Sequence, residues 1–462
     1  MKRPGKIFKT IKEPPITKVI SPLQDFIEKE ASSSKVLLIC IALGLLWANI
    51  PWGDTYNLVW NQQLGFTISS FSLYKPLLLW INDGLMAVFF FVIGLELKRE
   101  FMIGGLSNIR ESILSVVAAT GGIIVPVIIF ISINPPTFPG VDGWNVPVAT
   151  DIAIAIGILS LFSYKIPKKV KLLLTSMAIF DDLGAIVIIA IFHSAAINWI
   201  FLGISIGITV LLVAINLLGI RRSVFYFILG VFLWVSIFLS GIHATISGVI
   251  LALTIPATKR IDLEDFFALQ EKSFENLCEI REEEDLAACY NRLVTHIHAL
   301  ETSCRNVQTP LEILEHQLIG ITAFFIVPLF ALANSGINFF TLGTNPFTER
   351  IFWGIFCGLV FGKPIGVLLF TFLFTRLKAF KLSRNVNWLH IIGIGFLMGI
   401  GFTMANFIAG LAYAENATYL AVAKIAILLG SLLSGVIGYV VLHFSIKKLE
   451  VDLLAKSKEN ST

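Results

Sequence analysis

Hydrophobic residues along this chain gather into long runs, and charged residues or clusters of Pro and Gly separate them. A helix needs roughly 20 apolar residues to cross the hydrocarbon core of a bilayer. By this criterion we predict about twelve spans, at roughly 36–50, 76–97, 113–134, 147–162, 170–193, 197–218, 223–239, 242–256, 317–334, 350–375, 388–411 and 419–444. The pattern therefore predicts an all-α polytopic membrane protein with little room for a soluble domain.

Composition agrees with this class. Of 462 residues, 56% are hydrophobic and only 14% are charged. The net charge of +4 is small and its basic residues sit in short loops, so we expect no nucleic-acid partner. The five cysteines show no CxxC spacing and predict neither a disulfide framework nor a zinc site, and we expect no cofactor.

The loops alternate in charge. Lys and Arg collect on the cytoplasmic side of membrane proteins, and here they fill every second loop: Lys98 and Arg99, Lys165 to Lys171, Arg221 and Arg222, Lys259 and Arg260, and Arg376 to Arg384. Both basic tails, 1–34 and 447–462, fall on the same side as these loops. We therefore predict a multi-pass protein of the bacterial inner membrane, with its transmembrane domain at 35–446 and both termini in the cytoplasm.

The segment 261–312 differs from the rest, because it is strongly acidic and has an amphipathic, helix-like pattern. It is predicted to be a cytoplasmic insertion. One interpretation is a regulatory or partner-binding element, and the simpler one is a solvated helical hairpin between two spans.

Two adjacent aspartates, Asp181 and Asp182, form the strongest chemical signal. They occupy the middle of the apolar run from Val170 to His193, where a charge costs at least about 2.5 to 3.5 kcal/mol to insert. Consecutive helical residues point about 100° apart, so the two carboxylates should face different surroundings. Lys363, central in its own span, is the predicted partner for one of them, because a buried lysine is tolerable against a carboxylate.

A third acid, Asp151, lies in VPVATDIAIAIG, where Pro147 and a short flanking run predict a broken helix. Hard cations prefer oxygen ligands, and Thr150 adds a hydroxyl beside the carboxylate. Asp151 is therefore a candidate for cation involvement, for capping the half-helix that follows, or for both.

Glycines crowd the centre of the eleventh predicted span, in GIGFLMGIGFTMANF from Gly393 to Phe407. Such a stretch at bilayer depth is either a close-packing face or an interruption that lines a cavity. The fourth and eleventh spans hold corresponding places in two halves of three spans each, 3 to 5 and 10 to 12, which is the pattern of inverted-repeat transporters.

Other titratable residues lie near the predicted membrane edges. Asp83 is either a plain N-cap or a functional acid, and Glu96 is either functional or an interfacial acid balanced by Lys98 and Arg99. His243 would titrate close to neutral pH. Glu315 and His316, just before the ninth span, are equally open.

At these residues the sequence resembles the bacterial NhaA sodium/proton antiporter family, itself an example of inverted-repeat transporters. The resemblance runs from about Lys35 to Phe444, apart from the insertion, and is carried in order by these motifs: WINDGLMAVFF, VPVATDIA, AIFDDLGAI, GIHATISG, LEH, PLFALANSG, GKPIG and GIGFTM. It implies an antiporter fold in which two interrupted helices cross at the bilayer middle, a non-enzymatic exchange of Na⁺ or Li⁺ for H⁺ that serves sodium and pH homeostasis, and a homodimer.

The resemblance also implies roles for single residues. Asp182 would be the direct cation ligand and Asp181 a second carboxylate paired with Lys363. Asp151 and Thr150 would lie at the crossing and offset the half-helix dipoles, and Gly401 would lie in the chain break. The implied pH-response residues are Glu96, Glu315 and His316 on the cytoplasmic side, with Asp83 and His243 nearer the periplasm.

The chain departs from the family pattern at three places. In the family pattern a lysine occupies the position of Glu312 and a second histidine that of Ile319. After GFTM, the usual Ser-Ile is replaced by Ala405-Asn406. The pH set-point is the property that these departures affect.

We hypothesise that one site binds sodium or protons in turn. The resemblance implies that two protons exchange for each sodium in an electrogenic, pH-regulated cycle. An intramembrane aspartyl protease and a passive cation channel are the alternatives. Adjacent aspartates cannot flank a peptide bond, however, and a lysine at the centre of a pore would repel cations.

Overall fold

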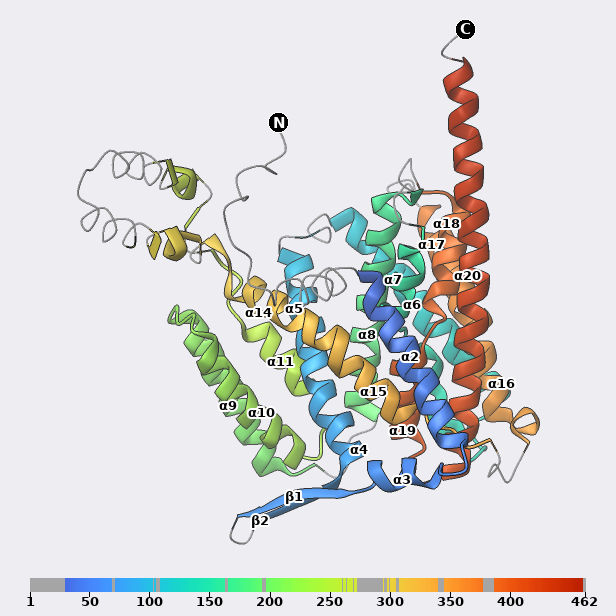
Figure 1. Ribbon diagram of the computed structural model, residues 1–462, viewed down its shortest axis with the longest axis horizontal. Helices are drawn as coiled ribbons and strands as arrows, with labels where there is room; N and C mark the ends of the chain where they lie inside the picture. The colour runs from blue at the N-terminus through green and yellow to red at the C-terminus, as the bar shows by residue number, and fades with distance from the viewer. Residues whose placement is uncertain are drawn as a thin grey trace, which may run out of the picture. The chain divides into compact units, whose positions relative to one another are not determined.

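The computed structural model describes residues 30–459 except 69–70, 103, 105–108, 163–164, 193–196, 260, 263, 269, 272–293, 295–296, 299, 305–306, 340–344 and 377–385. Helices dominate the described residues (Figure 1), so the predicted all-α class is confirmed. The single sheet among these residues is a hairpin of two antiparallel strands, which the sequence analysis did not anticipate.

The elements follow the chain in this order, with η marking 3-10 or π-helical segments: α2 Glu30–Asn49, α3 Asp54–Trp60, β1 Gln63–Ile68, β2 Phe71–Pro76, α4 Leu77–Trp80, η1 Ile81–Leu85, α5 Met86–Met102, α6 Ile109–Ile133, η3 Val141–Val148, α7 Ile152–Ser160, α8 Lys168–Phe192, α9 Trp199–Leu217, α10 Ser223–Leu239, α11 Ile246–Thr254, α14 Pro310–Ile321, η5 Thr322–Ile326, α15 Val327–Asn334, η6 Pro346–Thr348, α16 Arg350–Cys357, η7 Gly358–Gly362, α17 Lys363–Thr375, α18 Trp388–Met398, α19 Phe402–Ala412 and α20 Ala417–Glu459.

Each of the twelve predicted spans overlaps a helical segment, but the count of twelve membrane crossings is not confirmed. Among the described residues, nine helices are long and apolar enough to cross a membrane, or ten if the bent pair α18 and α19 forms one span. The remaining two helices are short. α10 has 17 residues and α11 has 9, less than the roughly 20 that a straight crossing needs.

Three helices cross the predicted domain limits. α2 begins at Glu30, inside the predicted tail 1–34, whose first 29 residues lie outside the described part of the chain. α14 begins at Pro310, inside the predicted insertion 261–312, and much of that insertion is not described. The predicted tail 447–462 is helical as far as Glu459, because α20 continues past the long apolar run that ends near Phe444.

The chain divides into two compact units, of which the first contains Met1–Leu78, Leu114–Ala185 and Ala323–Thr462. Within it, α2 packs on α15 and α7, and α20 packs along α16, α18 and α19, as Figure 1 shows for the long C-terminal helix. Small residues allow the close approach: a side chain at Gly395 would come within 3.0 Å of Pro364 Cα. The close-packing interpretation of the glycine-rich segment therefore holds for its first part.

The second unit contains Leu79–Ile113 and Ile186–Thr322. Its helices α5, α10 and α11 meet around a core of Leu95, Tyr226, Leu233, Ile237 and Ala252. The outer faces of its helices remain apolar: Leu217 of α9 is 83% exposed and Phe227 of α10 is 72% exposed. Exposed apolar faces of this extent suit contact with lipid rather than water.

Tyr56 links the short helix α3 to the end of α15 and to the residues just after it. Its hydroxyl donates to the Leu332 carbonyl at 2.8 Å and accepts from the Gly336 N–H at 2.9 Å, and its side chain is buried. Burial raises the pKa of Tyr56 above its usual value, so the hydroxyl keeps its proton through the neutral range.

We predict that Tyr56→Phe lowers the free energy of unfolding by about 1 to 3 kcal/mol, because it leaves two backbone groups without their partner. Thermal unfolding of the purified protein in detergent measures this loss. Asn57→Ala, on the exposed face of the same helix, is the matched control and should change the unfolding temperature little. Equal unfolding temperatures for Tyr56→Phe and the wild type would contradict the assignment.

Candidate cation and proton site

Asp181 and Asp182 lie in the middle of α8, and both side chains are completely buried. Lys363, at the start of α17, is also completely buried and forms an ion pair with Oδ2 of Asp181. This is the pairing predicted from the sequence. The charge of Asp182 also acts on Lys363, so the lysine sits in the field of both carboxylates.

Thr150 completes the contacts of Asp181. Its Oγ1 lies 2.5 Å from Asp181 Oδ2 and 2.8 Å from the Met398 carbonyl, and Lys363 Nζ donates to it at 3.2 Å. A hydroxyl carries one proton and cannot donate fully to two acceptors at once. A proton on Asp181 would remove this conflict, because the acid could then donate to Thr150 while Thr150 donates to Met398.

The fourth predicted span is interrupted, as the sequence predicts. The 3-10 segment η3 ends at Val148, the chain is extended at Ala149 and Asp151, and α7 begins at Ile152. Asp151 is the N-cap of α7, since its Oδ1 accepts from the Ile154 N–H at 3.2 Å. The capping interpretation of Asp151 is therefore confirmed, and its side chain makes a second contact described below.

The eleventh predicted span is also interrupted. α18 ends at Met398, α19 begins at Phe402, and the two helices are bent by 43°. Gly401 lies in the break, where a Cβ atom would come within 2.8 Å of the Ala149 carbonyl oxygen. Only a glycine permits this approach, so the expected position of Gly401 is confirmed.

The two breaks are bonded directly to one another. The Asp151 N–H donates to the Ile400 carbonyl at 2.5 Å, and Oδ2 of Asp151 accepts from the Thr403 hydroxyl at 2.6 Å and the Thr403 N–H at 3.1 Å. The Asp151 carboxylate thus caps the N-termini of both α7 and α19. A negative charge is favourable there, because the free N–H groups of a helix start carry partial positive charge.

The oxygen atoms of these side chains determine which ions the site can bind. Carboxylate and hydroxyl oxygens are the ligands that small hard cations prefer, and buried carboxylates also take up protons. Among the described residues, no group of three His, Cys, Asp or Glu side chains could hold a resident metal ion. Asp181, Asp182 and Thr150 provide carboxylate and hydroxyl oxygens of the kind that suits a small hard cation.

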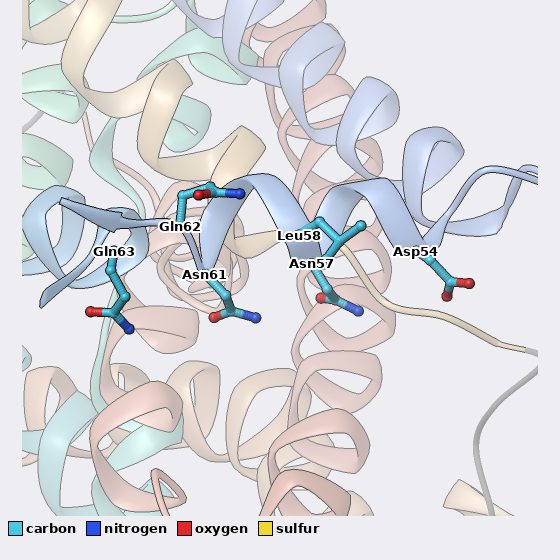
Figure 2. Close-up of a pocket in the computed structure, with 6 residues that line it drawn as sticks. All are labelled: Asp54, Asn57, Leu58, Asn61, Gln62 and Gln63. Atoms are coloured by element: carbon cyan, nitrogen blue, oxygen red, sulfur yellow. The ribbon is translucent and has the colours of Figure 1, made fainter.

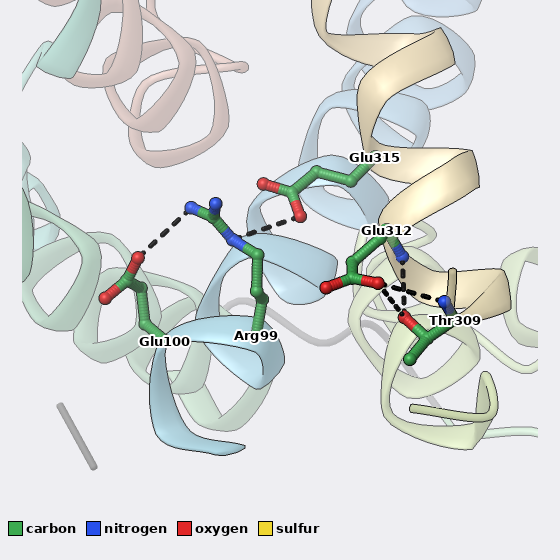
Figure 3. A network of polar contacts seen from close by, with 5 residues as sticks. All are labelled: Arg99, Glu100, Thr309, Glu312 and Glu315. Carbon is green, nitrogen blue, oxygen red and sulfur yellow. Dashed lines mark hydrogen bonds and ion pairs between the residues drawn. The ribbon is translucent and has the colours of Figure 1, made fainter. Parts of the chain in front are cut away.

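The candidate pH-response residues of the second unit fall into two places. In the first, Arg99 Nε lies 3.2 Å from Oε2 of the buried Glu315 and its Nη2 lies 3.1 Å from Glu100 (Figure 3). Glu96 is half-buried in the same helix α5, and His316 is exposed on α14.

Glu312, one of the departures from the family pattern, has a local structural role. It forms a capping box with Thr309 at the start of α14, and Pro310 occupies the first turn (Figure 3). Ile319, the second departure, is 47% exposed.

In the second place, His243 Nε2 lies 3.7 Å from Oδ1 of Asp83 and its Nδ1 is 2.9 Å from Thr245 Oγ1. The structure thus brings these two candidates together. The alternative that Asp83 is a plain N-cap is wrong, because Asp83 lies within the π-helical turn η1, in the interior of a helical span that runs from Leu77 to Met102.

A surface hollow in the first unit is a weaker candidate. It is lined by Asp54, Asn57, Leu58, Asn61, Gln62 and Gln63 (Figure 2). Asp54, Asn57 and Leu58 belong to α3, Asn61 is its C-cap, and all six residues are exposed. Exposed carboxamides interact with water as readily as with a ligand, so this hollow lacks the desolvated charges of the aspartate pair.

Sequence reasoning missed three contributors near the breaks and one lysine within an apolar span. Thr403 and the Met398 carbonyl are described above, and Ser431 Oγ accepts from the Gly401 N–H at 3.1 Å. Lys424, half-buried within the span of α20, was also overlooked. A lysine inside an apolar run is a readable signal, whereas a lone serine or threonine resembles any packing residue.

A buried ion pair bonded to one of two interrupted helices is typical of one class of protein, the ion-coupled membrane transporters. The family model described as Na⁺/H⁺ antiporter 1 matches residues 24–442. Antiporter NhaA 2 of Syntrophotalea carbinolica is 41% identical over 433 residues, covering 91% of this chain and 96% of the relative. NhaA of Oleidesulfovibrio alaskensis is 39% identical over 94% of this chain and 96% of its own length, and NhaA of Helicobacter pylori G27 is 38% identical over 90% and 94%.

The chain belongs to the NhaA family of Na⁺/H⁺ antiporters. It is a multi-pass membrane protein and a secondary transporter that exchanges Na⁺ for H⁺, and it is not an enzyme. Family membership also rejects the protease and channel alternatives.

The ion pair between Lys363 and Asp181 predicts a stability pattern. Lys363→Met leaves a buried carboxylate without its cation and should cost about 3 to 5 kcal/mol. The double variant Lys363→Met/Asp181→Asn removes both charges and should recover most of that loss. Unfolding temperatures of the purified variants in detergent test the prediction, and a double variant as unstable as the single one would contradict it.

Proposed function

We propose that Asp182 is the direct carboxylate ligand of the transported Na⁺ or Li⁺, and that Asp181 is the second carboxylate of the same site. The observation that carries this proposal is the complete burial of both carboxylates on one helix, beside a buried lysine and a threonine hydroxyl. Such charges are costly inside a membrane, so proteins place them there where they have a function.

Exchange follows from competition for this site. The carboxylates bind sodium when they are ionised on one side of the membrane, and they carry protons on the return. With two carboxylates, two protons leave for each sodium bound, which makes the exchange electrogenic. Lys363 stabilises the ionised form of Asp181. Lys363 and the bound cation are therefore both attracted to the carboxylate of Asp181.

Alternating access arises from movement of one bundle of helices around the interrupted ones. The bonds from Asp151 to Ile400 and Thr403 support this role for the crossing, because they join the two interrupted spans to one another. Thr150, Asp151, Lys363 and Gly401 are then the transport-supporting residues.

Activity is regulated by pH through groups away from the carboxylates. Asp83 with His243 is one candidate, and Glu315 with Arg99 is the other, joined by Glu96 and His316. Histidine changes its charge near neutral pH, and a buried carboxylate paired with arginine is sensitive to protonation.

Membrane placement follows from the charges of the loops. The basic loops support a bacterial inner-membrane protein with both termini in the cytoplasm, which acts in sodium and pH homeostasis. The domain limits are those of the antiporter domain at 35–446 with the acidic insertion at 261–312. Assembly as a homodimer rests on the family alone.

Asp182→Asn should abolish exchange, because it removes the charge that binds sodium. The measurement is dequenching of a pH-sensitive dye in everted vesicles from antiporter-deficient bacteria, with sodium, lithium or potassium added between about pH 6.5 and 8.5. Sodium or lithium should collapse the proton gradient with the wild type and leave it intact with the variant. Asp54→Asn, an exposed acid in α3, is the matched control and should exchange like the wild type.

If Asp182→Asn is present in the membrane and exchanges like the wild type, the proposed ligand is wrong. If the wild type dequenches with no cation at any pH, antiport through this site is wrong for this chain.

A further inference from the structure

Thr403 holds a place that the proposed transport roles leave unassigned. It is the second residue of α19, its side chain is 4% exposed, and both its hydroxyl and its N–H donate to Oδ2 of Asp151. Any residue except proline would supply the N–H. The hydroxyl bond, the shorter of the two at 2.6 Å, depends on the side chain.

The direction of this hydroxyl is unusual for a helical threonine. In an intact helix the hydroxyl commonly donates to the carbonyl four residues earlier. Thr120 and Thr209 do so here, to Val116 and Ser205 at 2.8 Å each. For Thr403 the equivalent residue is Gly399, which lies in the break, and the hydroxyl donates across the crossing instead.

The position of Asp151 matters to the site because of its neighbour. Thr150 is the adjacent residue, and its hydroxyl lies 2.5 Å from Asp181 Oδ2. The chain is extended on both sides of Thr150, at Ala149 and Asp151, so a shift of the Asp151 side chain and backbone carries Thr150 with it. A bond that holds Asp151 therefore also holds the hydroxyl that faces the proposed cation ligands.

We propose that Thr403 is a positioning residue for exchange: its hydroxyl fixes the Asp151 carboxylate at the crossing and thereby fixes Thr150 against Asp181. This inference rests on the proposed function of the aspartate pair. Thr403 bonds to Asp151, whereas Asp181 and Lys363 bond to Thr150 and to each other, so Thr403 acts through the segment from Thr150 to Asp151.

The test compares two nearly isosteric changes in proteoliposomes. Thr403→Val keeps the shape and removes the donor, whereas Thr403→Ser keeps the donor and removes a methyl group. Thr403→Val should raise the apparent KM for sodium and lithium roughly tenfold, the effect of losing one hydrogen bond to a charged group. Thr403→Ser should stay within about twofold of the wild type, because its hydroxyl can make the same bond.

Thr209→Val is the matched control, because it removes a hydroxyl that serves only its own helix. It should leave KM and the maximal rate unchanged. If Thr403→Val does not reach the membrane, Thr403→Cys and Thr403→Ala replace it, and KM should rise from serine through cysteine to alanine as the donor weakens and disappears.

Two results overturn the inference: a wild-type KM for Thr403→Val or its alanine substitute, or a serine variant as defective as the variant without a donor. Asp182→Asn, measured alongside, separates this failure from that of the proposed site. Loss of exchange in Asp182→Asn with normal Thr403 variants rejects only the role of Thr403. Normal exchange in Asp182→Asn rejects the site itself.

Discussion

Charged side chains and unpaired backbone N–H and carbonyl groups inside an apolar span must find partners within the protein, because lipid provides none. The buried ion pair of Lys363 with Asp181 meets this requirement for the side chains. Its partners lie in the apolar parts of α8 and α17, so the pair joins these two helices. Thr150 joins the pair to the interrupted fourth span.

The same requirement explains how two helices can be broken at one place. Each break exposes N–H and carbonyl groups, and the structure pairs them with one another and with nearby side chains. Asp151 accepts hydrogen bonds from N–H groups at the starts of α7 and α19. Thr150 donates to the Met398 carbonyl at the end of α18, and Ser431 accepts from the N–H of Gly401. The Thr150 hydroxyl also contacts Asp181, so the same hydroxyl binds the buried carboxylate and a carbonyl at the break.

Much of this architecture could be predicted from the sequence, because charges and long apolar runs leave clear signals. The helical segments, the Asp181 to Lys363 pair and both interruptions were found in this way. The number of crossings could not be fixed, since α10 and α11 are too short for hydropathy to decide.

Other features left weaker signals or none. The π-helical turn before Lys363 adds residues to a turn without any characteristic pattern, and the hydroxyl of Thr403 looks like that of any small packing residue. The capping box at Thr309 and Glu312 is readable from the TPLE sequence, whereas the family resemblance presents Glu312 only as a departure. The contact of His243 with Asp83 joins residues far apart in the chain, and spacing alone could not reveal it.

The most direct test of the central claim, that sodium and protons compete for one pair of carboxylates, is the apparent KM for sodium as a function of pH in proteoliposomes. Competition predicts that KM rises steadily as the pH falls while the maximal rate at saturating sodium stays constant, with a limiting slope near two on logarithmic axes if both carboxylates bind protons. A KM independent of pH, with only the maximal rate changing, would show that protons act elsewhere and would contradict the shared site.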